Sequence, residues 1–261
     1  MQQAQDFLEE CGALATLLAP LSDADYDTPT QFKQWTINQI LRHLQVWNMA
    51  ADLSLTDEPA FADFIVKMAA GIRGEQLPDF EAAYLYNLSG QKLREAWGES
   101  FKNVAQHFGK AGPKARLKWV GPDMSALSSV TARLMETWAH GQAIYDVLGV
   151  ERIDTDRIGN IVRLGVNTYG FNWKNRRQDP PGPLPRLCLT APSGAIWEYG
   201  EGDDRITGSA TEFCQVVTQC RNIADTSLEV TGEVAQQWMA VAQCFAGPPQ
   251  DPPAPGTRYR K

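Results

Sequence analysis

The chain has 261 residues, more than a single hydrophobic core comfortably holds, so its length favours two domains. With 43% hydrophobic and 21% charged residues it has the composition of a globular protein, which excludes the disordered and fibrous classes. A net charge of -7 argues against a protein that binds nucleic acid by neutralising phosphates.

Helical patterns fill the first part of the chain. Apolar residues recur at helical spacing in segments separated by helix-breaking residues, at 4–19, 36–54, 60–70, 78–107 and 125–149. A brief extended piece, 115–120, precedes the last of these helices. Because the connections are short, the pattern predicts a helical bundle, which we assign to residues 1–151.

The periodicity changes after a proline-rich break at 179–185. One more helix is expected before that break, at 155–173. Beyond it we expect strands at 186–190, 195–199, 204–208 and 227–231, and helices at 209–219 and 233–245. The fold class is therefore mainly α plus α+β, with a small α+β domain at 152–247. The proline-rich tail, 248–261, is expected to have little order.

The compartment is indicated by the cysteines and by the lack of targeting segments. The five cysteines form no CxxC pair, which fits a reducing cytoplasm better than a disulfide-linked secreted fold. The first residues lack the basic region and apolar core of a signal peptide, and no apolar run approaches a membrane-spanning length. We therefore expect a soluble cytoplasmic protein with no membrane or nucleic-acid partner.

Two polar side chains interrupt the apolar pattern of the predicted helix 125–149. Glu136 and His140 are four residues apart, so they lie on the same helix face. Such groups are costly to bury unless they are paired or bind a metal. An antiparallel bundle could bring His43 against them, giving two imidazoles and one carboxylate. This donor set suits zinc with one position left open, and it would also accept iron or nickel.

The residues alone leave a structural alternative open. A histidine on an apolar helix face is often a hydrogen-bonded core residue, and a Glu and a His four positions apart are often a helix-surface pair. His107 lies near the end of a predicted helix, where we expect it to stabilise that terminus or to be exposed. The sequence contains no P-loop, dinucleotide glycine fingerprint, nucleophile-elbow serine or HExxH motif.

Two motifs carry a family resemblance. Residues 35–44, WTINQILRHL, and 136–149, ETWAHGQAIYDVLG, resemble the amino-terminal domain of the mycothiol-dependent maleylpyruvate isomerase family, within the DinB-like superfamily. The resemblance implies an up-down four-helix bundle that holds a divalent metal, usually zinc. Matched residue by residue, the implied ligands fall on His43, Glu136 and His140. It also implies dimerisation through the helices, so a homodimer is expected on that ground alone.

The second part of the chain carries a weaker resemblance. Residues 206–232 are similar to the α+β domain that accompanies such bundles and is related in shape to sterol-carrier folds. They also resemble a segment named for wyosine base formation in transfer RNA, but the chain lacks an iron-sulfur cysteine motif and is too acidic for RNA. Arg221 is our candidate catalytic residue, binding an anionic group of a thiol or acid substrate. A surface salt bridge is the alternative.

The resemblance leads to two functional hypotheses. The first is a divalent-metal-dependent enzyme that acts on a small electrophilic substrate, as a thiol-dependent isomerase or transferase using a low-molecular-weight thiol. Mycothiol belongs to a limited group of bacteria, and nothing in the sequence identifies the thiol. The second is a small-molecule-binding or sensing protein in which the metal is structural. A fourth protein ligand would favour the second hypothesis, and an open metal position would favour the first.

Overall fold

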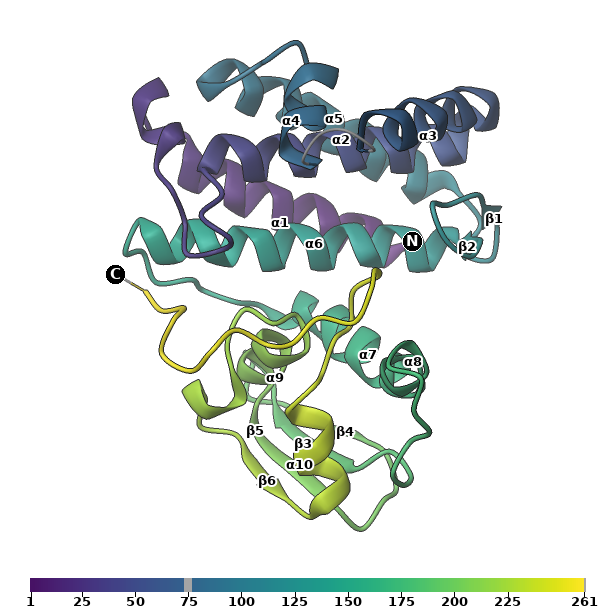
Figure 1. Cartoon of the computed structure of the whole chain (residues 1–261), viewed down its shortest axis with the longest axis vertical. Helices are drawn as coiled ribbons and strands as arrows, with labels where there is room; N and C mark the ends of the chain where they lie inside the picture. Colours follow the sequence, from purple (N-terminus) through teal and green to yellow (C-terminus); the bar gives the residue numbers. More distant parts are fainter. Residues whose placement is uncertain (73–76, 261) are drawn as a thin grey trace. The chain divides into compact units, whose positions relative to one another are not determined.

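The computed structural model describes residues 1–72 and 77–260, and the chain divides into two compact units, Met1–Val147 and Leu148–Lys261. The predicted boundary, after residue 151, lies four residues beyond the observed division. The first unit is helical and the second contains a small sheet with helices (Figure 1). The helical bundle followed by an α+β domain is therefore confirmed as the fold class.

The first unit is built from six helices within the described residues. Their bounds are α1 Gln2–Leu18, α2 Ile37–Thr56, α3 Glu58–Ile72, α4 Leu77–Tyr84, α5 Gly90–Lys110 and α6 Ala126–Val147. A short 3-10 helix, η1 Asp23–Asp27, follows α1, and a two-stranded sheet precedes α6, with β1 at Arg116–Leu117 and β2 at Met124–Ser125. Within the described residues, no helix is both long and apolar enough to cross a membrane.

The longest helices, α1, α2, α5 and α6, pack against one another around one core (Figure 1). Each contributes a stripe of apolar side chains, and the largest fully buried rings include Phe7, Trp97, Phe108 and Trp138. Helix α2 begins at a capping box in which Thr36 Oγ1 accepts from Gln39 N–H and Gln39 Oε1 accepts from Thr36 N–H, at 3.2 and 2.9 Å. This cap fixes where α2 starts and so which side chains face α6.

The predicted helix 78–107 is wrong in one respect, because the chain breaks into α4 and α5. Tyr86 and Asn87 adopt left-handed backbone conformations, and Asn87 N–H donates to Ala82 O at 2.8 Å, which ends α4. Gly90 also has a positive φ of 61°, and its N–H donates to Asn38 Oδ1 at 2.9 Å. The apolar spacing continues across this reversal, so periodicity alone could not detect it.

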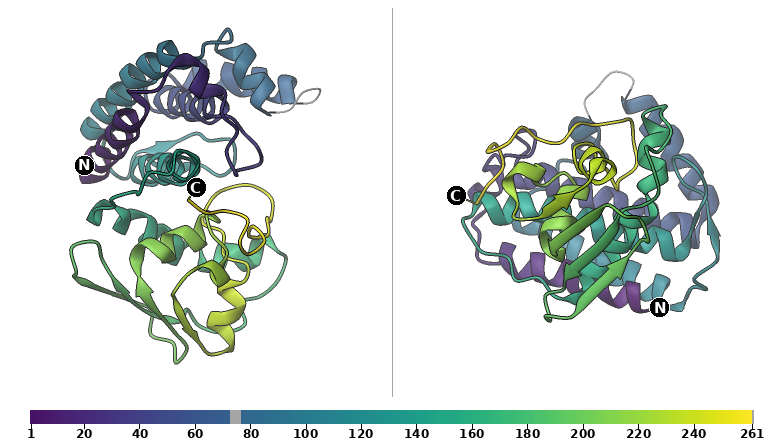
Figure 2. Two further views of the ribbon diagram at one scale, coloured as in Figure 1. Left: turned by 90° about the vertical axis from the view of Figure 1, so that its left-hand side faces the viewer. Right: turned by 90° about the horizontal axis from the view of Figure 1, so that it is seen from below.

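The second unit has a four-stranded sheet in the order β4-β3-β5-β6. Its elements are η2 Asp156–Ile158, α7 Gly159–Asn167, α8 Tyr169–Asn175, β3 Arg186–Thr190, β4 Ile196–Tyr199, β5 Arg205–Ser209, α9 Ala210–Val217, η3 Ile223–Asp225, β6 Glu229–Thr231 and α10 Glu233–Met239. Strands β3 and β5 are parallel and the other neighbours are antiparallel. Helix α9 packs on β3 and β5 (Figure 2). Leu187 and Leu189 of β3 and Ile206 of β5 are fully buried.

Two expectations for the second unit differ from the structure. The predicted helix 155–173 is divided at Thr168, and the predicted helix 233–245 ends at Met239. The proline-rich segment is held by side chains instead of lying free: Arg176 pairs with Asp251 at 3.0 Å, and Asn222 Nδ2 donates to Pro253 O at 2.8 Å. Proline-rich backbone has no internal hydrogen bonds, so its carbonyl groups are available to such donors.

Candidate metal centre

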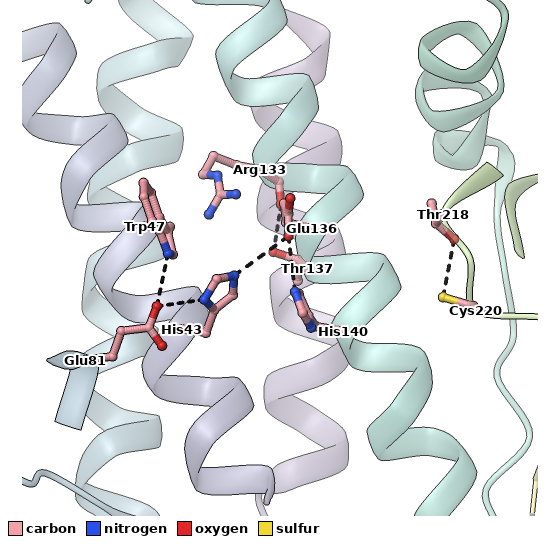
Figure 3. A network of polar contacts seen from close by, with 9 residues as sticks. All are labelled: His43, Trp47, Glu81, Arg133, Glu136, Thr137, His140, Thr218 and Cys220. Carbon is pink, nitrogen blue, oxygen red and sulfur yellow. Dashed lines mark hydrogen bonds and ion pairs between the residues drawn. The ribbon is translucent and has the colours of Figure 1, made fainter. Parts of the chain in front are cut away.

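The structure brings the three predicted ligands together in the first unit. His43 projects from α2, and Glu136 and His140 project from successive turns of α6 (Figure 3). One donor atom of each lies within 4.8 Å of the others. Glu136 Oε2 is 3.2 Å from His140 Nε2 and 3.9 Å from His43 Nε2. The side chains of His43, Glu136 and His140 are 13%, 22% and 12% exposed to solvent, so solvent reaches the cluster.

Glu81 of α4, which was not among the predicted site residues, fixes the orientation of His43. His43 Nδ1 lies 2.7 Å from Glu81 Oε1, and the same oxygen accepts from Trp47 Nε1–H at 3.1 Å. In Figure 3, Glu81 and Trp47 lie on one side of His43, while Glu136 and His140 lie on the other. With Nδ1–H held by a carboxylate, Nε2 of the same ring is directed at the cluster as a lone-pair donor.

The donor set fits a divalent metal. In a tetrahedral zinc site with bonds of about 2.0 to 2.1 Å, donor atoms are about 3.3 Å apart, and the two measured distances, 3.2 and 3.9 Å, lie near that value. The carboxylate that holds the far nitrogen of His43 is a feature typical of metal-binding histidines. Among the described residues, no fourth His, Cys, Asp or Glu joins this group.

Aromatic rings border the cluster. Trp35 stacks on His140 with the ring planes 2° apart and the centroids 6.2 Å apart, and Phe32 and His140 form a T-shaped pair with the centroids 4.9 Å apart. A tight turn places both rings, because Trp35 N–H donates to Phe32 O at 2.9 Å. The turn needs positive φ angles at Lys33 and Gln34, of 51° and 60°. Two residues in this unfavourable region mark a strained segment beside the candidate site.

Burial and opposite charges perturb the titration of the cluster. Burial lowers the pKa of His43, but the nearby carboxylates Glu81 and Glu136 outweigh it and raise this pKa to about 9. Burial raises the pKa of Glu136, but its contacts with the two histidines outweigh that effect and lower it well below the usual value. The pKa of His140 is lowered, chiefly by burial. Strong perturbation of neighbouring groups is typical of functional sites.

The remaining predicted residues lie elsewhere. His107 does not join the cluster: its Nδ1 lies 2.7 Å from Asp52 Oδ1, and the side chain is 39% exposed. Arg221 belongs to the second unit, where its Nη1 donates to Cys220 O at 3.0 Å. Its expected catalytic role stays a prediction. None of the five cysteines forms a disulfide bond within the described residues, and four of them are buried.

Comparison with known proteins gives matches of three kinds. The family model of the mycothiol maleylpyruvate isomerase N-terminal domain matches residues 7–145. An uncharacterized protein of Mycobacterium tuberculosis, matched in two strains, is 37% identical over 246 residues, covering 94% of this chain and 95% of the relative. The crystal structure of the mycothiol-dependent maleylpyruvate isomerase aligns with a TM-score of 0.52 at 15% identity, covering 82% of this chain and 87% of that one. A mutant of that enzyme aligns with a TM-score of 0.51.

Proposed function

The chain belongs to the mycothiol maleylpyruvate isomerase family, and we propose that it is a divalent-metal-dependent enzyme. The proposed reaction is a thiol-dependent isomerisation, or a related transfer, of a small electrophilic substrate. The observation that carries this proposal is the convergence of His43, Glu136 and His140 on one point that solvent reaches.

His43, Glu136 and His140 would hold the metal, for which the two imidazoles and one carboxylate favour zinc. Such an ion supplies a positive charge that lowers the pKa of a thiol or water and so provides a nucleophile at neutral pH. The hydrogen bond to Glu81 would hold the proton of His43 on Nδ1, which leaves the lone pair of Nε2 to bind the metal. Phe32 and Trp35 restrict the movement of His140 and shield it from bulk water.

The number of donors argues for catalysis over a structural metal. Structural zinc sites are almost always closed by four protein ligands, whereas catalytic sites have three and an open position. Among the His, Cys, Asp and Glu side chains of the described part of the chain, three would serve as ligands in this cluster. This count favours an enzyme over a sensing protein whose metal is structural.

The names of the relatives suggest the first reaction to test. The solved relative is a mycothiol-dependent maleylpyruvate isomerase, so maleylpyruvate and mycothiol are the proposed first substrate pair.

Chromatography of maleylpyruvate incubated with zinc-loaded protein and mycothiol tests this proposal. We expect isomerisation by the wild-type protein and its loss in His140→Ala, while His107→Ala, which changes a histidine outside the cluster, retains it. Unchanged maleylpyruvate with mycothiol, and also with glutathione, would contradict the isomerase assignment.

A further inference from the structure

A buried guanidinium lies beside the three candidate metal ligands, His43, Glu136 and His140. Arg133 is on α6, three residues before Glu136, and is only 4% exposed to solvent. Figure 3 shows its guanidinium directed from α6 toward α2, on the side of Trp47. Its Nη1 is covered from solvent and has no hydrogen-bond partner among the described residues.

An arginine in this state is unusual. Burying a charged group is costly unless hydrogen bonds satisfy it, and a guanidinium has five donors to satisfy. The carboxylates of Glu136 and Glu81 are near enough to interact electrostatically with Arg133. Within the described residues, however, neither of them forms a hydrogen bond or ion pair with it. The opposite charges of Glu136 and Glu81 therefore offset only part of the cost of burying Arg133, and Nη1 of its planar donor fork is left without an acceptor among the described residues.

The position of this fork indicates its ligand. Positions i and i+3 share a helix face, so Arg133 and Glu136 line the same side of α6. His43 and Glu136 remain partly exposed at 13% and 22%, while Arg133 lies deeper. A ligand that reaches the cluster from solvent would extend its far end toward Arg133. The planar fork of arginine matches two carboxylate oxygens.

We propose that Arg133 forms a carboxylate-binding subsite beside the metal centre. Arg133 would accept a terminal carboxylate while the rest of the ligand lies against the cluster. This inference deepens the proposed function by assigning the ligand a carboxylate. That group can belong to the acid substrate or to a low-molecular-weight thiol that carries a free carboxylate, and binding measurements distinguish the two sources.

Isothermal titration calorimetry of the zinc-loaded and metal-free full chain tests the subsite. The probes are maleate, a dicarboxylate without a thiol, and N-acetylcysteine, compared with its amide. We expect Arg133→Gln to weaken binding of a carboxylate probe about 10-fold or more, because a charge-assisted hydrogen bond pair is lost. Arg133→Lys, which keeps the charge but not the fork, should give intermediate binding. If Arg133→Gln weakens the binding of maleate, the acid substrate is the source of the carboxylate. If Arg133→Gln weakens the binding of N-acetylcysteine but not of its amide, the thiol is the source.

The matched control is Arg42→Gln. Arg42 is an arginine of the same unit whose Nε already donates to Leu88 O at 2.8 Å, so binding should change less than about twofold. Wild-type affinity in folded Arg133→Gln, or in Arg133→Lys where the first variant does not fold, would overturn the proposal. So would failure of the wild-type chain to bind either carboxylate probe. Zinc content is measured in the same samples, and its absence would count against the proposed function, while the metal-free titrations still decide the subsite.

Discussion

Glu81→Gln is the change that most directly perturbs the support of His43. Glu81 is completely buried, and its Oε1 lies 2.7 Å from His43 Nδ1 and 3.1 Å from Trp47 Nε1. Glutamine keeps the size of the side chain and one acceptor oxygen, so the fold should be retained. The negative charge that strengthens His43 as a metal ligand is lost. Loss of such a supporting carboxylate typically weakens metal binding 10- to 100-fold, or by about 1.4 to 2.8 kcal/mol.

Competition for zinc with a chromophoric chelator measures this change in affinity. Trp47→Phe removes the second hydrogen bond to Glu81 but leaves the bond to His43, so zinc affinity should fall less than in Glu81→Gln. Glu99→Gln changes a carboxylate that is 76% exposed on α5 and should leave the affinity unchanged. Equal zinc affinities of wild-type protein and folded Glu81→Gln would refute the reasoning that Glu81 supports a metal ligand.

Two further predictions concern stability. Burial raises the pKa of the Cys11 and Cys214 thiols well above the ordinary 9.0, so above pH 9 the unfolded chain binds fewer protons than the folded one. The free energy of unfolding is therefore unaffected below that pH and falls above it, by about 1.4 kcal/mol per pH unit for each thiol. Urea denaturation between about pH 7 and pH 10.5 should show a smaller fall for Cys11→Ala than for wild type, and equal slopes would contradict this. Gly90→Ala should destabilise the first unit by about 2 kcal/mol, because φ is 61° and a Cβ would collide with the Asp23 carboxylate. Urea denaturation measures both glycine variants, and Gly98→Ala, at a helical position with open space around it, should be neutral or stabilising; similar losses in the two variants would count against this explanation.

Most helices of the first unit could be predicted from helical periodicity. The stripes of α1, α2 and α6 each bury one continuous face, so apolar spacing located them closely. The break between α4 and α5 depends instead on left-handed conformations at Tyr86 and Asn87, which are not glycines. Local spacing does not register such a reversal, because contacts with α2 determine it.

The candidate site was predictable only in part. Glu136 and His140 share one helix, so their spacing already placed them together. His43 required the bundle topology and the family resemblance. Glu81 and Arg133 were missed because other charged residues stand on the same helices, Asp79 on α4 and Glu136 on α6, and composition does not tell which charges are buried. Glu81 follows Phe80 and precedes two alanines, and a charge on the face that the apolar spacing assigns to the core is the signal that would have found both residues.

The metal content of the purified chain is the direct test of the proposed metal centre. Elemental analysis of untagged protein after incubation with zinc and removal of unbound metal should give about one ion per chain. His107→Ala should retain that ion, because His107 pairs with Asp52 outside the cluster, whereas His140→Ala should lose it. Wild-type protein without metal, or His140→Ala with as much metal as wild type, would contradict the assignment of His43, Glu136 and His140 as a metal centre.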